Sequence, residues 1–459
     1  MRSFEMTPEK QSNSTQRITT ERQPPKPASI RKTQKKVSKV PKEKKPKPMN
    51  LDAAVPPQVV GEGTYGCVHK PSLHCDSVQI YTNKVSKFMT TKNAETELNE
   101  YEKIAKIDKK RRFYLGKPIK CSPNKNDETM DAIQKCKLID KYFKDLTDYR
   151  LLIMKDGGIN LEQFGEKVAE WKTTPDNEEK IERFWIEAQR ILYGLKVFID
   201  NDIIHHDLKP QNIVYNEKQN RLNFIDFGLM DTKTNIIQLS KNSKNDLAGV
   251  HWSFPFELQF LNLDEYNFVA NDSNEVKTDY VNKLFTDKTT YHYTHISTFL
   301  NYVQENRENE FKSMKTNFLN TVINHVVPGK YKSFLEKSVR TIDVYGTGIA
   351  FVYLLHKSAH LLDKPLVLEF DKLFSLMITS HLPSRIEPDD LLTRYEDILF
   401  KHGLLKKYDL RFKNHILKPG KLKIPKTLQN IDSSQFVISK EEFEKTVTKE
   451  IEPPKEKMD

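Results

Sequence analysis

The sequence has few of the residues that characterise disulfide-rich or membrane-spanning proteins. Only four cysteines occur in 459 residues, and no two form a Cys-x-x-Cys pair, so we expect neither a disulfide framework nor a zinc site. The longest apolar run, GIAFVYLL, is much shorter than the roughly 20 residues that cross a bilayer. The opening MRSFEMTPEK lacks the apolar core of a signal peptide. These absences predict a soluble, intracellular protein without a transmembrane segment.

The cysteines leave one alternative open. Two of them lie near two histidines, and together they offer a candidate metal cluster of Cys67, His69, His74 and Cys75. We favour ordinary thiols in a reducing compartment over this cluster.

Positive charge is concentrated at the N-terminus. The formal net charge is +11, and residues 1–50 hold 14 Lys/Arg against 4 Asp/Glu, a net of +10 that leaves +1 for the rest. Few large apolar residues occur in this segment, so burial cannot offset the entropy lost on ordering it. The pattern predicts a disordered basic tail over residues 1–50. Such a tail either contacts nucleic acid or another acidic surface, or serves only as a solubilising segment.

From Pro56 the sequence changes to strands and then to helices. Alternating or apolar strand patterns occur in VVGEGTYGCVHK, NKVSKFMT and RLLIMKDGG. Helical patterns follow in RFWIEAQRILYGLKVFIDN and in DVYGTGIAFVYLLHKSAHLL, the second of which is apolar on nearly every side. Strands first and helices later predict an α+β fold with two lobes, the first small and β-rich and the second larger and helical.

A glycine-rich turn lies between the first two predicted strands. Gly61, Gly63 and Gly66 form G-x-G-x-x-G, a weak signal because dinucleotide-binding folds share it. A dinucleotide-binding turn leads into a helix, whereas CVHK continues here as a strand, which favours a hairpin lying over phosphates. The predicted nucleotide-binding residues of this hairpin are Val60, Gly61, Glu62, Gly63, Thr64, Tyr65, Gly66, Cys67 and Val68.

A lysine in the next predicted strand is a candidate ligand for ATP phosphates. Lys87 has apolar neighbours, and a buried ammonium is costly unless it meets an anion. Lys84 is the rival, and we prefer Lys87. The helix expected at 94–107 offers a carboxylate to position it, and we choose Glu100, with Glu97 as the alternative.

Polar residues at fixed spacing occupy the apolar stretch IIHHDLKPQNIVYN. Asp207 can accept or orient a hydroxyl proton, Lys209 can neutralise a transferred phosphoryl group, and the amide oxygen of Asn212 can bind Mg²⁺. Downstream, Asp226 in LNFIDFGLM ends an apolar strand and supplies a second Mg²⁺ ligand. Phosphoryl transfer depends mainly on positioning and charge neutralisation, which this set provides.

HHDLKPQN and IDFG resemble the catalytic and metal-binding loops of eukaryotic-type protein kinases. Glycine loop, strand lysine, helix glutamate and both loops occur in that family's order, and the resemblance covers about residues 56–400. It implies an N-lobe at 56–155, a C-lobe at 156–402 and a C-terminal extension at 403–459. The lysine of DLKPQN is similar to that of serine/threonine kinases, so ATP, Mg²⁺ and protein substrates are implied.

The sequence of the glycine loop, VVGEGTYGCVHKPSL, also resembles that of kinases of large nucleocytoplasmic DNA viruses, iridoviruses above all. That resemblance implies the host cytoplasm or the virion as the location. Three alternatives are weaker: a pseudokinase that acts as a scaffold, a small-molecule kinase of similar fold, and an accessory nucleic-acid-binding module. The first is disfavoured because Lys87, Asp207, Asn212 and Asp226 are all present.

The resemblance also implies supporting contacts and shows departures. Glu257 in FPFE is expected to pair with Arg385, and Asp343 in DVYGTG to brace the catalytic loop. The arginine that usually precedes the catalytic aspartate is His206 here, so we expect activity without phosphorylation of the activation loop. Residues 258–342 form a long insertion before the buried helix at Asp343, and we interpret it as a docking segment for a substrate or partner.

Overall fold

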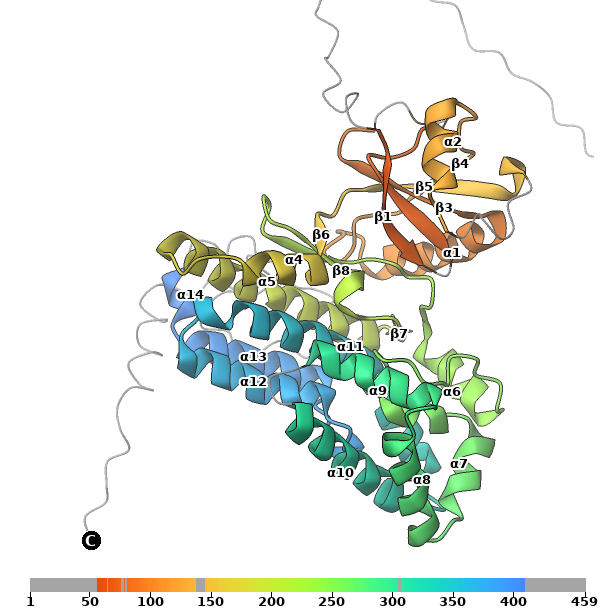
Figure 1. Ribbon diagram of the computed structural model, residues 1–459, viewed down its shortest axis with the longest axis vertical. Helices are drawn as coiled ribbons and strands as arrows, with labels where there is room; N and C mark the ends of the chain where they lie inside the picture. Colours follow the sequence, from red (N-terminus) through yellow and green to blue (C-terminus); the bar gives the residue numbers. More distant parts are fainter. Residues whose placement is uncertain are drawn as a thin grey trace, which may run out of the picture. The chain divides into compact units, whose positions relative to one another are not determined.

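A small antiparallel sheet in the N-terminal part precedes a larger helical part (Figure 1). The computed structural model describes residues 56–63, 65–75, 78, 81–137, 145–303 and 307–408. The α+β class, with strands first and helices later, is therefore confirmed. The predicted basic tail at 1–50, Thr64 and most of the predicted extension at 403–459 lie outside the described residues.

Every neighbouring pair of strands in the five-stranded sheet is antiparallel, in the order β1-β2-β3-β5-β4. The strands are β1 (Gln58–Gly63), β2 (Gly66–Lys70), β3 (Lys84–Thr90), β4 (Ile119–Cys121) and β5 (Tyr149–Lys155). Two helices accompany them, α1 (Thr91–Ile107) and α2 (Asp127–Gln134), and a 3-10 turn, η2 (Leu146–Asp148), leads into β5. The central position of β3 places Lys87 between two neighbouring strands.

Two long helices form the centre of the helical part, α5 (Pro175–Asp200) and α11 (Tyr331–Ser358). The start of α5 follows from its sequence, because Thr174 accepts the Asn177 N–H and a proline occupies the first turn. Shorter helices pack beside these two: α4 against α11, α12 against α11, and α13 against α5 (Figure 1). They are α4 (Leu161–Ala169), α12 (Lys364–Ile378), α13 (Pro388–Lys401) and the final turn α14 (Leu404–Lys407).

Short strands, turns and a short helix lie between α5 and residue 260, and one further short strand lies just before α4. Two small sheets form, β6-β8-β9 and β10-β7, all antiparallel. Their strands are β6 (Ile159–Asn160), β7 (Ile203–Ile204), β8 (Ile213–Asn216), β9 (Arg221–Phe224) and β10 (Asp231–Thr232). The other elements of this stretch are η3 (Pro210–Asn212), α6 (Lys233–Lys241) and η4 (Phe256–Phe260). Ile203–Asn216, called the 203–216 loop below, runs from β7 through η3 to β8.

The inserted segment, residues 258–342, is largely helical. Its helices are α7 (Leu263–Ala270), α8 (Asn274–Thr286), α9 (Tyr291–Tyr302) and α10 (Arg307–His325). Its expected end at 342 is wrong as a structural boundary, because α11 already begins at Tyr331. Phe334, Leu335 and Val339 are buried at helical spacing, so their burial extends α11 toward its N-terminus.

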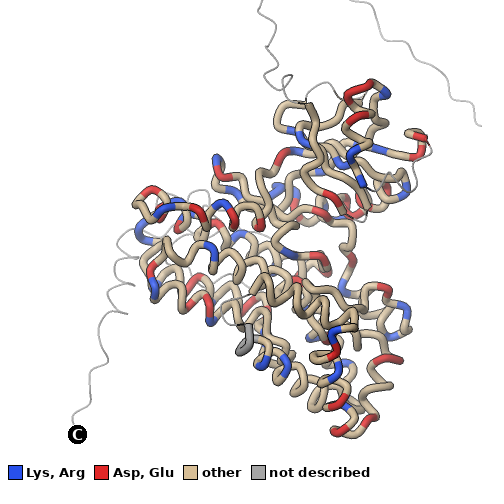
Figure 2. The backbone as a smooth tube through the Cα atoms, viewed as in Figure 1, with Lys and Arg blue, Asp and Glu red and all other residues tan. Residues whose placement is uncertain are grey.

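Charged residues of both signs are intermixed along the described chain, whereas α11 is largely uncharged in its second half (Figure 2). The first half of α11 carries lysines, an arginine, a glutamate and Asp343. Within the described ranges, no helix combines the length and the apolar character needed to cross a bilayer.

The cysteines correct one expectation from the sequence. All four are paired, Cys67 with Cys136 and Cys75 with Cys121, so the prediction of free thiols is wrong, and with it the metal cluster. The pairs lie 69 and 46 residues apart, with Cα atoms 6.0 and 6.1 Å apart, so no local spacing could indicate them. All four belong to the buried core of the sheet part, where β2, β4 and the end of α2 meet.

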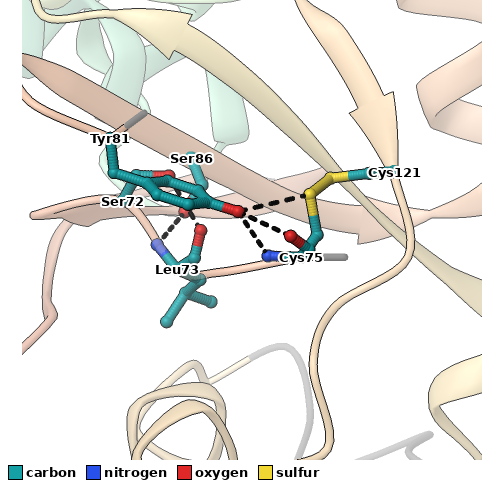
Figure 3. Close-up of a disulfide and its surroundings, with 6 residues drawn as sticks. All are labelled: Ser72, Leu73, Cys75, Tyr81, Ser86 and Cys121. Atoms are coloured by element: carbon teal, nitrogen blue, oxygen red, sulfur yellow. Dashed lines mark hydrogen bonds between the residues drawn. A yellow bond between two sulfur atoms is a disulfide. The ribbon is translucent and has the colours of Figure 1, made fainter. Parts of the chain in front are cut away.

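The hydroxyl of Tyr81 contacts the second disulfide at Cys75. The Tyr81 hydroxyl donates to the Cys75 carbonyl oxygen at 2.7 Å and accepts from the Cys75 N–H at 2.8 Å (Figure 3). It also lies 3.7 Å from Cys75 Sγ. Nearby, the Leu73 N–H donates to Ser86 Oγ on β3 at 2.9 Å, which fixes the chain between β2 and the disulfide.

Both disulfides are expected to stabilise the sheet part by restricting its unfolded chain. The chain-entropy estimate for a loop this long is about 4 kcal/mol per disulfide. We therefore expect the double variant Cys67→Ala/Cys136→Ala to lose roughly that much unfolding free energy in a urea titration. Alkylation of the denatured, unreduced protein, followed by mass measurement, should find no free thiol; four alkylated cysteines would contradict the pairing.

Candidate active site

Lys87 is a buried cation held by two carboxylates. Its side chain is 8% exposed, and Nζ lies 2.8 Å from Glu97 Oε2 and 2.8 Å from Asp226 Oδ1. Burial alone would lower the pKa of Lys87, but the charges of Asp226 and Glu97 outweigh burial and raise that pKa. The ammonium is therefore charged at neutral pH. Lys84, the rival considered from the sequence, is half-buried at the start of β3.

The helix partner of Lys87 is Glu97, so the preferred choice of Glu100 is wrong. Because α1 begins at Thr91, directly after β3, its inward stripe consists of Ala94, Glu97, Tyr101 and Ile104. Glu100 lies at the edge of that stripe and forms an ion pair with Lys103 at 2.8 Å. The spacing of Glu97 before Tyr101 and Ile104, four and seven residues, is the sequence signal that could have identified it.

Asp226 approaches Lys87 from the helical part. It follows β9 and Ile225, adopts a left-handed backbone with φ of 60°, and has a side chain that is 39% exposed. Burial would raise the pKa of Asp226, but the charge and hydrogen bond of Lys87, together with the charges of His205 and Lys209, lower it. Asp226 is therefore an ionised carboxylate paired with Lys87, a lysine 139 positions away in the sequence.

Asp207, Lys209 and Asn212 form a compact group in the 203–216 loop. Lys209 Nζ lies 2.7 and 2.8 Å from the two carboxylate oxygens of Asp207. The amide Nδ2 of Asn212 donates to Asp207 Oδ2 at 2.8 Å and to the Asp207 carbonyl oxygen at 2.7 Å. Because the nitrogen is used in this way, Oδ1 is the Asn212 atom that can bind a cation.

Backbone bonds join this group to the Asp226 segment. The Ile225 N–H donates to the Asn212 carbonyl oxygen at 3.1 Å, and the ring of His205 contacts the Ile225 carbonyl oxygen at 3.0 Å. The five sequence-predicted residues Lys87, Asp207, Lys209, Asn212 and Asp226 thus lie on directly connected segments of one site.

Helix α11 supports the 203–216 loop through Asp343, as the family resemblance implied. Its carboxylate accepts the backbone N–H groups of His205 at 2.7 Å and His206 at 2.8 Å. One turn further on, Gly346 lies so close to the loop that a Cβ there would be 2.1 Å from the Leu208 carbonyl oxygen. Only glycine permits this approach.

His206 is neutral and buried. Its backbone is left-handed, with φ of 67°, and its ring packs on Phe254 at 5.1 Å between centroids. Burial, reinforced by the neighbouring His205, lowers the pKa of His206 to about 4. The residue therefore offers no positive charge to an anion at neutral pH.

A buried ion pair anchors the segment that ends at Glu257, and the expected pairing with Arg385 is confirmed. Both side chains are fully buried, and the guanidinium binds both carboxylate oxygens of Glu257, with a 3.0 Å bond from one nitrogen to Oε2. Arg385 also donates to the Thr379 carbonyl oxygen and lies 5.0 Å above the Tyr345 ring.

The glycine-rich stretch is a hairpin of β1 and β2, as its sequence predicts. Gly63 pairs with Gly66 across the turn, and a bulge lies between Val59 and Gly61. A Cβ on Gly66 would lie 2.6 Å from the Phe88 carbonyl oxygen, so this glycine allows β2 to approach β3. The register of β2 on β3 pairs Val68 with Lys87, which places the hairpin beside the buried lysine.

The predicted nucleotide contacts of the hairpin differ in their exposure. Val60 and Tyr65 are about half exposed, whereas Cys67 is fully buried in its disulfide. Glu62 is bound by Lys137, through its backbone N–H at 3.3 Å and its ammonium at 3.1 Å, and these bonds lower the pKa of Glu62. The chain after α2 thus holds the hairpin through Glu62 as well as through Cys67.

Comparison of the sequence with family models and with curated proteins gave no match. The geometry of the site is therefore what supports a function. Within the described ranges, no three His, Cys, Asp or Glu side chains gather as a metal site of their own.

Proposed function

We propose that the protein is an ATP- and Mg²⁺-dependent protein kinase that phosphorylates serine or threonine hydroxyls. The observation that carries this proposal is the connected set Lys87–Glu97–Asp226 and Asp207–Lys209–Asn212. In the first group Lys87 is bound by two acids, and in the second Asp207 is bound by a lysine and an amide; the backbone bond from Ile225 to Asn212 joins the two groups. Phosphoryl transfer needs such charge neutralisation and positioning. The resemblance of the glycine-loop sequence to that of viral kinases is part of the same proposal.

The donor set suits magnesium bound together with a nucleotide. Mg²⁺ is usually held by one or two protein oxygen ligands plus substrate phosphates and water, so a site of protein ligands alone is not required. Asp226 and Asn212 are the oxygen donors proposed for it, and Lys87 is proposed for the phosphates. Bound Mg²⁺ would supply neutralisation of the charge on the phosphate oxygens.

The acceptor side uses the residues of the 203–216 loop. Transfer forms a bond between the acceptor hydroxyl oxygen and the γ-phosphorus and breaks the bond from that phosphorus to ADP. Asp207 is proposed to orient the hydroxyl and accept its proton, and Lys209 to neutralise the transferred group. The hydrogen bond from Asn212 holds the Asp207 carboxylate in place for this role.

The direct experiment is incubation with labelled ATP, Mg²⁺ and a generic basic protein. We expect label transfer by the wild type. Asp207→Asn should reduce transfer by about 10²–10⁴-fold, the usual loss when a general base is removed. Asp226→Asn should abolish the Mg²⁺-dependent turnover while leaving a folded protein by circular dichroism, with a lower thermal unfolding midpoint because the buried Lys87 loses one of its two acids. A wild type without transfer would favour the alternative, a catalytically weak scaffold protein, and wild-type turnover by Asp226→Asn would contradict its metal role.

The ion pair inside the sheet part provides a second prediction with matched controls. Glu97→Gln should reduce turnover by about 10- to 100-fold, because a misplaced phosphate ligand costs positioning. Glu100→Gln, the same change one turn away, should stay within about twofold of the wild type. Lys87→Ala should lose most activity and Lys84→Ala little; the reverse order in a steady-state assay would reassign the lysine.

Four serine and threonine hydroxyls in the segment after Asp226 make hydrogen bonds within the fold. Thr232 accepts the Asn235 N–H at the start of α6, and Thr234 donates to Asp202 at 2.9 Å. Ser240 accepts from the Asn245 amide at 3.0 Å, and Ser243 accepts the Asp264 N–H at 3.0 Å. With His206 uncharged, this segment has no cation at that position to bind a phosphate.

We therefore expect activity without phosphorylation of this segment. Phosphatase-treated protein should transfer phosphate at the untreated rate, and alanine at Thr232, Thr234, Ser240 or Ser243 should not abolish transfer. Thermal unfolding of each variant separates a loss of fold from a loss of regulation. Inactivity of a stable alanine variant, with the phosphate on that residue confirmed by mass spectrometry, would refute this expectation.

A further inference from the structure

Helix α9 of the inserted segment contacts the candidate active site through its last residue. The Tyr302 hydroxyl accepts a hydrogen bond from Gln211 Nε2 at 2.7 Å and donates to Glu162 Oε1 at 2.5 Å. Gln211 lies between Lys209 and Asn212 in the 203–216 loop, and Glu162 lies in the first turn of α4. One tyrosine therefore links three segments that are distant in the sequence.

The ring of the same tyrosine supports the segment before Glu257. Tyr302 stacks on Trp252 with 4.4 Å between centroids and an angle of 8° between the planes. Burial lowers the pKa of the adjacent His251, and the charge of Lys209 lowers it further while that of Asp207 raises it. A second contact joins His251 to His295 of α9 at 5.5 Å between rings. The acceptor side of the proposed transfer site therefore has α9 as its neighbour.

The position of α9 is fixed by aromatic contacts of its buried Phe299. Phe299 is buried and stacks on Tyr345 of α11 at 5.9 Å and 17°, and it also contacts Phe256 at 6.0 Å. Because α11 also holds the 203–216 loop through Asp343, the helix and the loop share one support. Tyr302 can thus act as a fixed contact on the loop.

The direction of the hydrogen bonds is fixed by charge. Burial and the hydrogen bond to the Glu162 carboxylate both raise the pKa of Tyr302. The phenol therefore stays protonated, and its O–H donates a hydrogen bond to Glu162. Its lone pairs then accept from Gln211. Replacing the hydroxyl leaves the partly buried amide of Gln211 without this acceptor.

We propose that Tyr302 is a positioning residue by which the inserted segment sets the acceptor side of the transfer site. It holds Gln211 in the 203–216 loop and Trp252 beside it, so that α9 forms part of the surface on which a protein acceptor binds. This inference rests on the proposed kinase function. It gives the insertion a role at the acceptor, while Lys87, proposed for the phosphates, and its partners Glu97 and Asp226 lie on other elements.

The test compares two tyrosine-to-phenylalanine variants within the insertion. Tyr302→Phe removes the hydrogen bonds to Gln211 and Glu162 and keeps the ring on Trp252. Tyr280→Phe is the matched control, since its hydroxyl donates to Gln259 at 2.6 Å, inside the insertion. With casein or histone as the acceptor, Tyr302→Phe should lower acceptor kcat/KM by roughly 10-fold, and Tyr280→Phe by less than about twofold. The KM for ATP should be unchanged in both.

Hydrogen–deuterium exchange provides a readout that does not need activity. Tyr302→Phe should increase exchange in peptides covering 203–216, and Tyr280→Phe should not. If the wild type transfers phosphate but Tyr302→Phe has wild-type acceptor kinetics, or raises the KM for ATP equally, this proposal is overturned. If the wild type transfers none, the proposed function fails, and exchange alone decides: unchanged protection at 203–216 overturns the positioning role, and increased exchange supports it.

Discussion

The ammonium of Lys87 between two carboxylates is the contact on which the candidate site depends. A buried cation without partners would cost several kcal/mol, and each of its partners comes from a different part of the chain. Glu97 belongs to α1, which follows β3 directly, whereas Asp226 follows β9 in the helical part. The ion pair therefore sets the phase of α1 against the sheet and also ties the sheet to the segment after β9. Removing either acid leaves the ammonium underneutralised, so the three residues act as one unit.

Helix α11 holds the 203–216 loop in place, as Lys87 and its two acids hold α1 and the segment after β9. Asp343 accepts two N–H groups of that loop, Gly346 allows its close approach, and Tyr345 contacts both Phe299 and Arg385. The buried Arg385–Glu257 pair then fixes the end of the segment that carries Trp252. One helix thus supports the loop, its neighbouring segment and the inserted helix α9. This shared support explains why α11 is uncharged over most of its second half: nearly all of its surface is in contact with protein.

Local patterns could be predicted from the sequence, whereas the long-range pairings that were predicted, Glu257 with Arg385 and Asp343 with the 203–216 loop, came from the family resemblance. The spacing of Asp207, Lys209 and Asn212 lies within one short loop, so their meeting follows from local chain geometry. The choice between Glu97 and Glu100 needed the phase of α1, which depends on the residue where the helix begins. Cys67 and Cys136 are 69 residues apart and carry no local signal, and Tyr302 reaches Gln211 across 91 positions. The pairs that were missed are those decided by packing of the whole chain.

The two halves of the candidate site can change independently, because they have different supports. Lys87, Glu97 and the glycine hairpin belong to the sheet part, which contains the two disulfides. Gln211, Trp252 and Tyr302 belong to the α11-supported part, and among the described residues Asp226 joins the two parts by its ion pair with Lys87. Under the proposed function, the first half would bind the nucleotide and the second the acceptor. A long insertion placed against the second half can then alter which proteins are bound without disturbing how phosphate is held.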